Sequence, residues 1–208
     1  TQMRVQPISY SSTNLIDART NTTDSAIKTK LDNWYKTNLV NYTSYLADET
    51  FCSDRSITSG SGYLTAPSTA YGAYNRLQNN KNPSLKCSRD NDKFKVSNES
   101  AKLNYPVGLI LADEVALAGG RTYYNGDYSP NSNYYLYNGK NFSTFTPAHF
   151  DSNRMEARVL TVMSIGGINT WYGVTALAGI RPVINIKKDV TISKGDGSSL
   201  NPFVLSGN

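Results

Sequence analysis

Histidine and cysteine are nearly missing from this sequence. The 208 residues include one histidine, His149, and two cysteines, Cys52 and Cys87. A zinc site usually takes about four protein ligands, most of them Cys or His, so we expect no metal site and no cofactor. Catalysis by a serine nucleophile would have to use His149 as its general base, because the chain has no second imidazole. We interpret His149 as a loop contact and expect no catalytic residue.

The sequence also has few charges and no long apolar run. Charged residues make up 18% of the chain, the net charge is +5, and Lys187-Lys188 is the one basic doublet. Phosphate binding needs clustered Lys and Arg, so we exclude nucleic acid as a partner. No segment is apolar over the length that spans a bilayer, so we expect no direct membrane insertion by this chain.

The start of the chain and the two cysteines both favour an extracellular protein. The sequence begins at Thr1 rather than at a methionine, which is compatible with the removal of a signal peptide or a membrane anchor. We expect the protein to be extracellular or at the cell surface, anchored through a segment missing from this chain. As a disulfide, Cys52 and Cys87 would close a loop of about 36 residues and contribute roughly 4 kcal/mol by the chain-entropy relation. Disulfides persist in oxidising compartments. The alternative is two unrelated buried thiols.

Tyrosine is abundant, with fifteen residues in the chain. It offers a large amphipathic contact area with few rotatable bonds, and mixtures of Tyr, Ser, Asn and Gly are common in antibody paratopes. Since apolar residues make up only 38% of the chain, neutral polar groups must cover much of the surface. We predict a Tyr- and Asn-rich surface that binds a partner; the alternative is that the composition reflects codon bias.

The first part of the sequence predicts one amphipathic helix and then a long irregular stretch. Residues 24–39 have the apolar spacing of a helix, with Thr23 or Asp24 as the candidate cap. The apolar positions of this helix are Ile27, Leu31, Trp34, Tyr35 and Leu39. Residues 41–101 are rich in turn formers and carry both cysteines, with one short helix expected over 70–77. A disulfide would hold this stretch against the core.

The second half of the sequence is β-rich. We predict a strand over 105–110 and then a helix over 112–118, with Asp113 and Glu114 in its first turn and Gly119-Gly120 as its stop. Further strands are expected at 134–137, 142–146, 157–163, 181–186, 191–192 and 203–205. Turn signals at 138–139, 166–167 and 195–197 separate them.

Residues 195–197 also contain a candidate calcium ligand, Asp196. One carboxylate is too few for a calcium site, so we expect a β-turn there.

Several segments resemble a family of uncharacterised surface proteins from Gram-positive gut bacteria, known as a domain of unknown function. The segments that carry the resemblance are residues 31–35, 51–56, 71–77, 105–114, 118–120, 146–147, 179–185, 195–197 and 201–203. They cover most of the chain in one order. The chain departs from the family pattern at Leu111, where Thr is usual, and at Phe145, in a stretch that is often Trp-rich.

The C-terminal half of that family is similar to the formylglycine-generating-enzyme branch of the C-type-lectin-like fold. The resemblance implies a single domain over residues 1–208 of the α+β, C-type-lectin-like class, with two main helices, small antiparallel sheets and long irregular loops. A disulfide-stapled loop insertion would lie at about 41–101. The enzyme branch needs redox-active cysteines late in the sequence, and neither Cys52 nor Cys87 lies there. Because this fold serves enzymes and adhesins alike, it does not fix the function.

In a C-type-lectin-like domain, ligand would meet the loops ahead of the strand at 181–186. Aromatic rings stack on sugars or anchor protein contacts, and Asn supplies paired donors and acceptors. The candidate ligand-binding residues are Tyr123, Tyr124, Tyr128, Tyr134, Tyr135, Tyr137, Asn141, Asn153, Asn169, Trp171 and Tyr172. For each of them a role in the core or scaffold is the alternative.

The sequence supports three functional hypotheses in order of preference. The first is a non-enzymatic recognition or adhesion domain that binds a glycan or a protein on a host or bacterial surface. The second is a structural subunit of a pilus or another surface assembly. The third is a degenerate hydrolase, which would need a polar pocket and a nearby carboxylate around His149.

Overall fold

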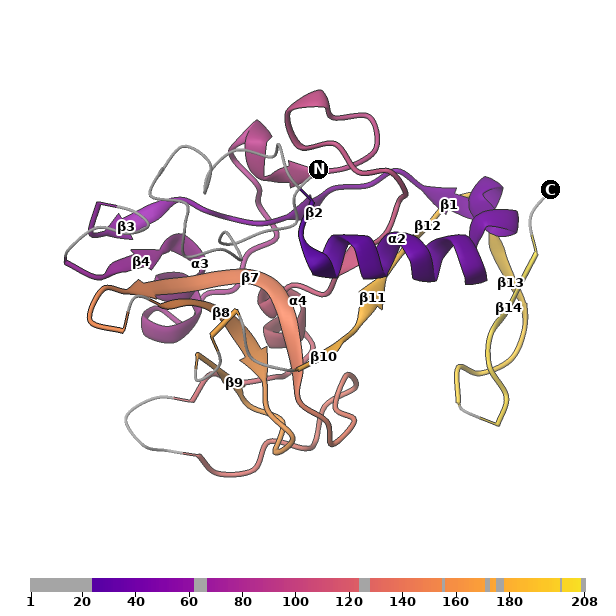
Figure 1. Cartoon of the computed structure of the whole chain (residues 1–208). Coiled ribbons are helices and arrows are strands. Elements are labelled where there is room, and N and C mark those ends of the chain that lie inside the picture. Colours follow the sequence, from indigo (N-terminus) through magenta and orange to yellow (C-terminus); the bar gives the residue numbers. More distant parts are fainter. Residues whose placement is uncertain are drawn as a thin grey trace.

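The computed structural model describes residues 24–61, 67–123, 128–154, 156–170, 173–174, 178–198 and 200–206. In these ranges the protein is a mixed α+β structure with a few short helices and small, mostly antiparallel sheets, as the sequence predicted (Figure 1). The helical segments are α2 (Ala26–Asn38), η1 (Val40–Tyr45), α3 (Gly72–Tyr74), η2 (Asn75–Asn79), η3 (Asp90–Asp92), η4 (Glu99–Ala101) and α4 (Ala112–Leu117). The strands are β1 (Leu46–Ala47), β2 (Phe51–Cys52), β3 (Ile57–Ser59), β4 (Thr69–Tyr71), β5 (Lys93–Phe94), β6 (Gly108–Leu109), β7 (Phe142–Asp151), β8 (Glu156–Val162), β9 (Ile168–Asn169), β10 (Gly179–Ile180), β11 (Pro182–Val183), β12 (Asn185–Ile186), β13 (Thr191–Lys194) and β14 (Val204–Ser206).

The helix α2 forms where its apolar spacing predicted, but with a different cap. The side chain of Ser25 accepts a hydrogen bond of 3.1 Å from the backbone N–H of Lys28, so Ser25 rather than Asp24 is the N-cap. Thr23, the other predicted cap, lies outside the described residues. Leu31 and Tyr35 are fully buried against the core, whereas Trp34 is 37% exposed. The helix therefore buries a narrower apolar face than its sequence pattern predicted.

The largest sheet has the strand order β3-β4-β7-β8-β9, and β10 pairs in parallel with the start of β7. The long strand β7 crosses the middle of the molecule (Figure 1). It continues beyond the predicted end at Thr146 to Asp151, with shifts in its register to β8 on both sides of Pro147. Irregular pairing is where a strand tolerates proline, which has no N–H to donate.

Four two-stranded ladders complete the described part of the fold. They are β1-β12, β2-β5, β6-β11 and the hairpin β13-β14. The predicted strand over 105–110 shortens to β6, and the one over 181–186 divides between β11 and β12, since each end pairs with a different partner. Residues 134–137 form a turn, closed by a hydrogen bond from Tyr137 N–H to the Tyr134 carbonyl, and not the predicted strand.

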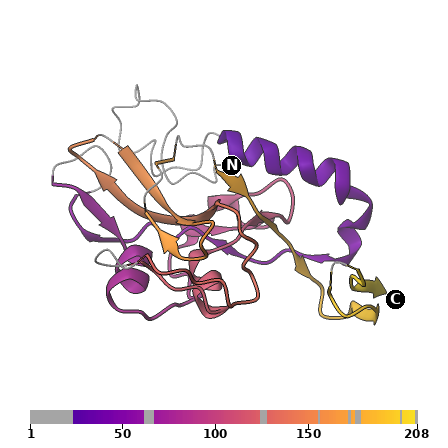
Figure 2. The same ribbon diagram turned by 90° about the horizontal axis from the view of Figure 1, so that it is seen from below.

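Two clusters of buried side chains form the core. One joins Leu31 and Tyr35 of α2 to Phe51, Phe94 and neighbouring residues of the cysteine-bearing stretch. The other packs α4 and η2 against the β7-β8 pair. Val183 of β11 contacts both clusters, so the C-terminal strands join them. The hairpin β13-β14 instead projects beyond α2 and η1, close to the C-terminus (Figures 1 and 2).

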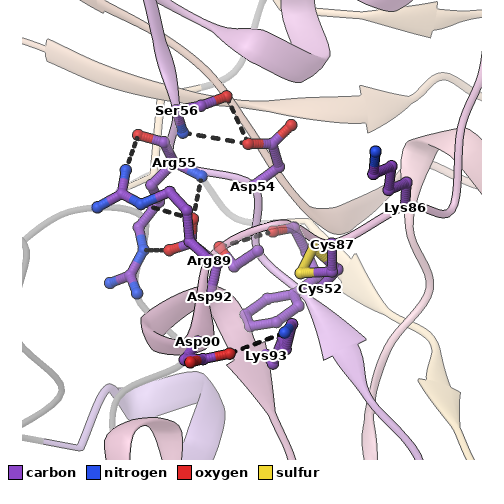
Figure 3. Close-up of a disulfide and its surroundings, with 12 residues drawn as sticks. Cys52, Asp54, Arg55, Ser56, Lys86, Cys87, Arg89, Asp90, Asp92 and Lys93 are labelled. Atoms are coloured by element: carbon purple, nitrogen blue, oxygen red, sulfur yellow. Dashed lines mark hydrogen bonds and ion pairs between the residues drawn. A yellow bond between two sulfur atoms is a disulfide. The ribbon is translucent and has the colours of Figure 1, made fainter.

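The predicted disulfide between Cys52 and Cys87 is present, with the two Cα atoms 5.8 Å apart. Beside it, the Arg55 guanidinium donates a 2.6 Å hydrogen bond to buried Asp92, and Asp92 also accepts from the Arg55 backbone N–H (Figure 3). Arg89 donates to the Arg55 carbonyl at 3.2 Å. These hydrogen bonds and the disulfide give the irregular stretch a fixed shape. The disulfide also indicates an oxidising, non-cytoplasmic compartment.

In the parts of the chain that are described, no helix is long and apolar enough to cross a membrane.

Candidate functional site

Residues 128–141 form an irregular loop that we call the tyrosine loop. It contains neither a helix nor a strand. Five of the residues predicted to bind a ligand lie on it. They are Tyr128, Tyr134, Tyr135, Tyr137 and Asn141. About half of the predicted site residues therefore lie on one irregular segment.

The tyrosine loop is braced against the turn between β8 and β9, residues 163–167. Tyr134 donates to the Gly166 carbonyl at 2.8 Å, Tyr137 donates to the Ser164 carbonyl at 3.3 Å, and the backbone N–H of Asn131 donates to the Ile165 carbonyl at 2.8 Å. Asn141 accepts from the backbone N–H of Ser164 at 2.5 Å. Arg181 adds a further brace, a hydrogen bond of 2.7 Å to the carbonyl of Leu136. A loop with so many bonds to its surroundings is held in one shape without regular secondary structure.

Gly166 permits the close approach of loop and turn. Its φ of +92° lies in the left-handed region, and a Cβ atom there would be 1.7 Å from the carbonyl oxygen of Asn131. No other residue type fits at this position without displacing the loop.

Tyr135 is the aromatic residue that the braced loop exposes most. Its side chain is 88% exposed, while its neighbours Tyr134 and Tyr137 are partly buried and hydrogen-bonded to the turn. Tyr128, at the start of the loop, is 41% exposed, and its ring lies against that of Tyr123 at a centroid distance of 5.6 Å. Among the described aromatic residues that were predicted to bind a ligand, Tyr135 and Tyr128 are therefore the most exposed.

The remaining predicted residues divide between the interior, a distant turn and the part of the chain that is not described. Tyr123 and Asn169 are only 4% and 7% exposed, so neither presents a surface to a ligand. Tyr123 packs over Gly167, where a Cβ would be 1.9 Å from its ring, and it supports the turn. Asn153 is exposed in the turn between β7 and β8, at the opposite end of β7 from Asn141. Tyr124, Trp171 and Tyr172 lie outside the described residues.

A pocket of about 270 Å³ opens beside the tyrosine loop. Its described lining residues are Leu77, Lys81, Pro83, Ala116, Gly120, Arg121 and Thr122. Arg121 donates to the Ser129 carbonyl at 2.9 Å, and the side chain of Asn131 donates to the Gly119 carbonyl at 3.2 Å, so the pocket wall and the loop are directly joined. No sequence pattern predicts this pocket, because its described lining residues lie in two segments, 77–83 and 116–122, that meet only in the fold.

Lys81 occupies an unusual backbone position in the pocket wall. It follows η2 with a φ of +52°, the one described residue other than glycine with a positive φ. Glycine usually takes this position after a helix, since the left-handed conformation costs other residues about 1 kcal/mol. The Lys81 ammonium donates to Thr122 Oγ1 at 2.6 Å, and Thr122 in turn donates to the Leu77 carbonyl. Partial burial lowers the pKa of Lys81.

His149 lies on β7, away from the tyrosine loop. Its Nδ1 atom is buried and has no hydrogen-bond partner, and its ring packs in a T-shaped arrangement with that of Tyr74, with the ring centroids 5.6 Å apart. Burial lowers the pKa of His149, and the charge of Arg158 across the strand pair lowers it further. A hydrolytic dyad needs a carboxylate that orients this nitrogen, so the geometry gives the hydrolase hypothesis no support. His149 belongs to a strand, which corrects the predicted loop contact.

Asp113 and Glu114, predicted as first-turn groups of α4, have different partners. Glu114 accepts a 2.7 Å hydrogen bond from the Leu111 backbone N–H and so caps the helix. Asp113 is buried and accepts two hydrogen bonds, of 2.8 and 2.9 Å, from Arg76, whose third guanidinium nitrogen donates to Asp54. Hydrogen bonding to Asp113 raises the pKa of Arg76 above its ordinary value. This ion cluster joins η2, α4 and the stretch after β2, and its groups are committed to one another.

The described side chains contain no group of three or more His, Cys, Asp or Glu residues able to hold a metal ion. Residues 195–197 form the predicted turn, in which Asp196 accepts a hydrogen bond from the backbone N–H of Ser198 at 2.9 Å.

Comparisons of the chain with models of protein families, with curated proteins and with solved structures find no match.

Proposed function

We propose that this chain is a non-enzymatic extracellular recognition or adhesion domain that binds its partner, a glycan or a surface protein, through the tyrosine loop. The observation that carries the proposal is the combination of an 88% exposed Tyr135 with a loop braced on both sides of it. Single exposed aromatic residues are common and mean little. An aromatic residue held out from a fixed loop is different, because little conformational entropy is lost when it becomes ordered in a complex.

The chemistry of the loop suits polar ligands. The rings of Tyr135 and Tyr128 offer flat apolar faces, and the exposed side chains of Ser132 and Asn133 add hydrogen-bonding groups between them. Aromatic contact combined with adaptable polar groups is the pattern of recognition loops. The disulfide supports the extracellular placement.

A C-type-lectin-like architecture is part of the same proposal. That fold carries ligands on long irregular loops ahead of its closing strands, and the tyrosine loop lies ahead of β11 and β12 in the chain. The mixed α+β structure with small sheets is compatible with this assignment. The non-enzymatic assignment is supported by the unpartnered Nδ1 of His149 and by the mutual pairing of Arg76, Asp54 and Asp113.

The test is a binding screen of the full chain on arrays of glycans and of extracellular proteins, repeated with Tyr135→Ala. We expect at least one partner whose binding weakens about tenfold or more, the scale of an interface anchor residue. Tyr42→Ala is the matched control, because Tyr42 is also exposed, at 56%, but lies on η1. A partner bound equally well by Tyr135→Ala, or no partner at all, would contradict the proposal.

A second candidate function, a structural subunit of a pilus or other surface assembly, is favoured by the hairpin β13-β14. Its side chains Ile192, Phe203 and Val204 are 57%, 50% and 48% exposed. Among the described strands, β13 and β14 pair only with each other, and an isolated hairpin is marginally stable in water. Sedimentation velocity over a range of concentrations tests this candidate. Self-association that Ile192→Lys abolishes would support it, and a monomer at all concentrations would refute it.

A further inference from the structure

The helix α2 carries a lysine that the protein encloses. The side chain of Lys28 is 1% exposed, whereas most lysines keep their ammonium group in water. Its ammonium donates a hydrogen bond to the carboxylate of Asp32, one helical turn further along. It also lies 3.8 Å from the carboxylate of Asp24, just before the helix. Lys28 is therefore a buried amine in direct contact with a carboxylate.

A third side chain reaches the same carboxylate from a distant part of the chain. Asn104 lies in the bend before β6, and its side-chain nitrogen donates a 2.7 Å hydrogen bond to Oδ2 of Asp32. The same oxygen atom accepts from Lys28. Two nitrogen atoms that share one acceptor oxygen are within about 5 Å of each other. The amine of Lys28 and the amide of Asn104 are thus neighbours across one carboxylate, although seventy-two residues separate Asp32 from Asn104.

We propose that Lys28 and Asn104 become joined by an intramolecular isopeptide bond, with Asp32 as the group that carries the protons. This condensation needs an amine, an amide carbonyl carbon and an acid-base group in contact with both. An ion pair within one helix would explain the contact of Lys28 with Asp32. It would not require that an amide from another segment bind the same oxygen atom.

The reaction balances without an oxidant or any further reactant. Asp32 accepts a proton from the Lys28 ammonium, and the lone pair of the resulting amine attacks Cγ of Asn104. As the new carbon–nitrogen bond forms, Asp32 relays a proton from the attacking nitrogen to the Asn104 nitrogen, and the bond from Cγ to that nitrogen breaks. The products are one amide and one ammonia, which takes up the first proton and leaves Asp32 ionised. Because Asn104 is exposed, the ammonia can leave directly into solvent.

The fold supplies the proximity that this reaction requires. Tyr105, which follows Asn104, stacks on the buried Tyr35 of α2 with the ring centroids 4.7 Å apart. Leu103, which precedes Asn104, is 1% exposed and belongs to the same core cluster as Tyr35. Both neighbours are thus anchored, and they hold the amide beside Lys28. Groups held together in this way react as if their concentration were on the order of 10⁵ M or more when they are well oriented.

This inference goes beyond the recognition function and does not depend on it. The bond would form once per molecule and would turn over no substrate, so it is compatible with a non-enzymatic domain. It would close a covalent ring around the segment that contains Cys52 and Cys87. Because reduction does not open an amide, α2 would stay attached to residue 104 even where the disulfide is lost.

The test is the intact mass of the purified full chain after reduction and denaturation. We expect the unchanged protein to be lighter than its sequence by one molecule of ammonia. Lys28→Met and Asn104→Ala should each have the full mass of their own sequences. Since Asn104 is exposed, its variant should fold, and the test does not depend on the folding of the Lys28 variant. Lys36→Met, which replaces an exposed lysine on the same helix, is the matched control and should keep the loss of ammonia.

Tandem mass spectrometry of a tryptic digest locates the bond. We expect a branched peptide in which Lys28 is joined to Asn104, with no cleavage after Lys28. A protein with the full mass of its sequence would overturn the proposal. A loss of ammonia that persists in Asn104→Ala would overturn it too, because backbone attack at Asn138-Gly139 also releases ammonia. The loss of one water instead would show an amide between Lys28 and Asp32 and would remove the assignment of Asn104.

Discussion

The hydroxyl group of Tyr134 donates a 2.8 Å hydrogen bond to the carbonyl oxygen of Gly166, thirty-two residues further along the chain. This bond joins the middle of the tyrosine loop to the turn between β8 and β9. Since β8 belongs to the central sheet, the position of the tyrosine loop is set by hydrogen bonds to a turn of that sheet. The consequences for stability and binding can be measured at the residues that make this connection.

Gly166→Ala should detach the tyrosine loop from the turn. The new Cβ would be 1.7 Å from the Asn131 carbonyl oxygen, at a φ of +92°, so we expect a loss of roughly 2 kcal/mol or more from the free energy of unfolding. Chemical denaturation measures the loss. Gly139→Ala is the control, because Gly139 also has a positive φ, +68°, but its Cβ would meet nothing closer than 3.7 Å. Equal losses in the two variants would show that the loop is not held at Gly166.

Removing the disulfide should destabilise the protein without abolishing the central sheet. Replacing Cys52 and Cys87 together by Ser frees a stretch whose ends are 35 residues apart, and we expect a loss of about 2–4 kcal/mol in the free energy of unfolding. Thermal unfolding of the oxidised protein, the reduced protein and the double variant measures it. Reduction should lower the midpoint of the unchanged protein and leave that of the double variant where it is. An oxidised protein no more stable than the double variant would contradict this prediction.

His149 should make the protein less stable in mild acid. Its folded pKa is lowered, first by burial and then by Arg158, below the ordinary value of 6.5. The folded state therefore binds the proton more weakly than the unfolded state, so its stability is complete above pH 6.5 and falls as the pH drops from there toward the folded pKa. Because the chain has one histidine, His149→Gln should remove this dependence. Denaturation curves between neutral and mildly acidic pH measure it, and the same dependence in His149→Gln would assign it to another group.

Breaking the ion cluster at Arg76 should cost far more than breaking a surface ion pair. Arg76→Met leaves the buried Asp113 and the half-buried Asp54 without their shared cation, and we expect a loss of about 3 kcal/mol. Lys102→Met is the control, because it breaks an exposed pair with Glu99, which should contribute less than about 1 kcal/mol. Urea unfolding compares the two variants. A loss at Arg76 as small as that at Lys102 would show that the cluster does not hold η2 to α4.

The elements predicted well from the sequence are those whose signals are local. The apolar spacing of Leu31 and Tyr35 located α2, and the sequence from Ala112 to Gly120 located α4 and its end. The strand β7 extends past its predicted end at Thr146. Proline usually interrupts strand pairing, but here the pairing with β8 shifts around Pro147. Residues 134–137 consist of tyrosine and leucine, and tyrosine is favoured in strands. The hydroxyl groups of Tyr134 and Tyr137 instead donate to carbonyl groups of a distant turn.

The candidate site was predicted in part, for a similar reason. Tyrosine content pointed to the loop, yet it did not separate the buried Tyr123 from the exposed Tyr135, because exposure depends on the turn that covers one and not the other. Lys81 was not predicted to be special, because no local sequence pattern indicates that a lysine has a left-handed backbone conformation. The pocket forms where residues 77–83 meet residues 116–122, and this contact between two distant segments depends on tertiary packing.

The bonds that hold the tyrosine loop to the turn at 163–167 end largely on main-chain carbonyl oxygens, those of Ser164, Ile165 and Gly166. Every residue type has such an oxygen, so the side chains of Ser164 and Ile165 can be exchanged without loosening the loop, whereas Gly166 and Gly167 have no room for a side chain. On the loop itself, Ser132, Asn133 and Tyr135 are exposed. These three positions can therefore be randomised together on an otherwise unchanged protein, which makes the chain a suitable framework for selecting new binding specificities.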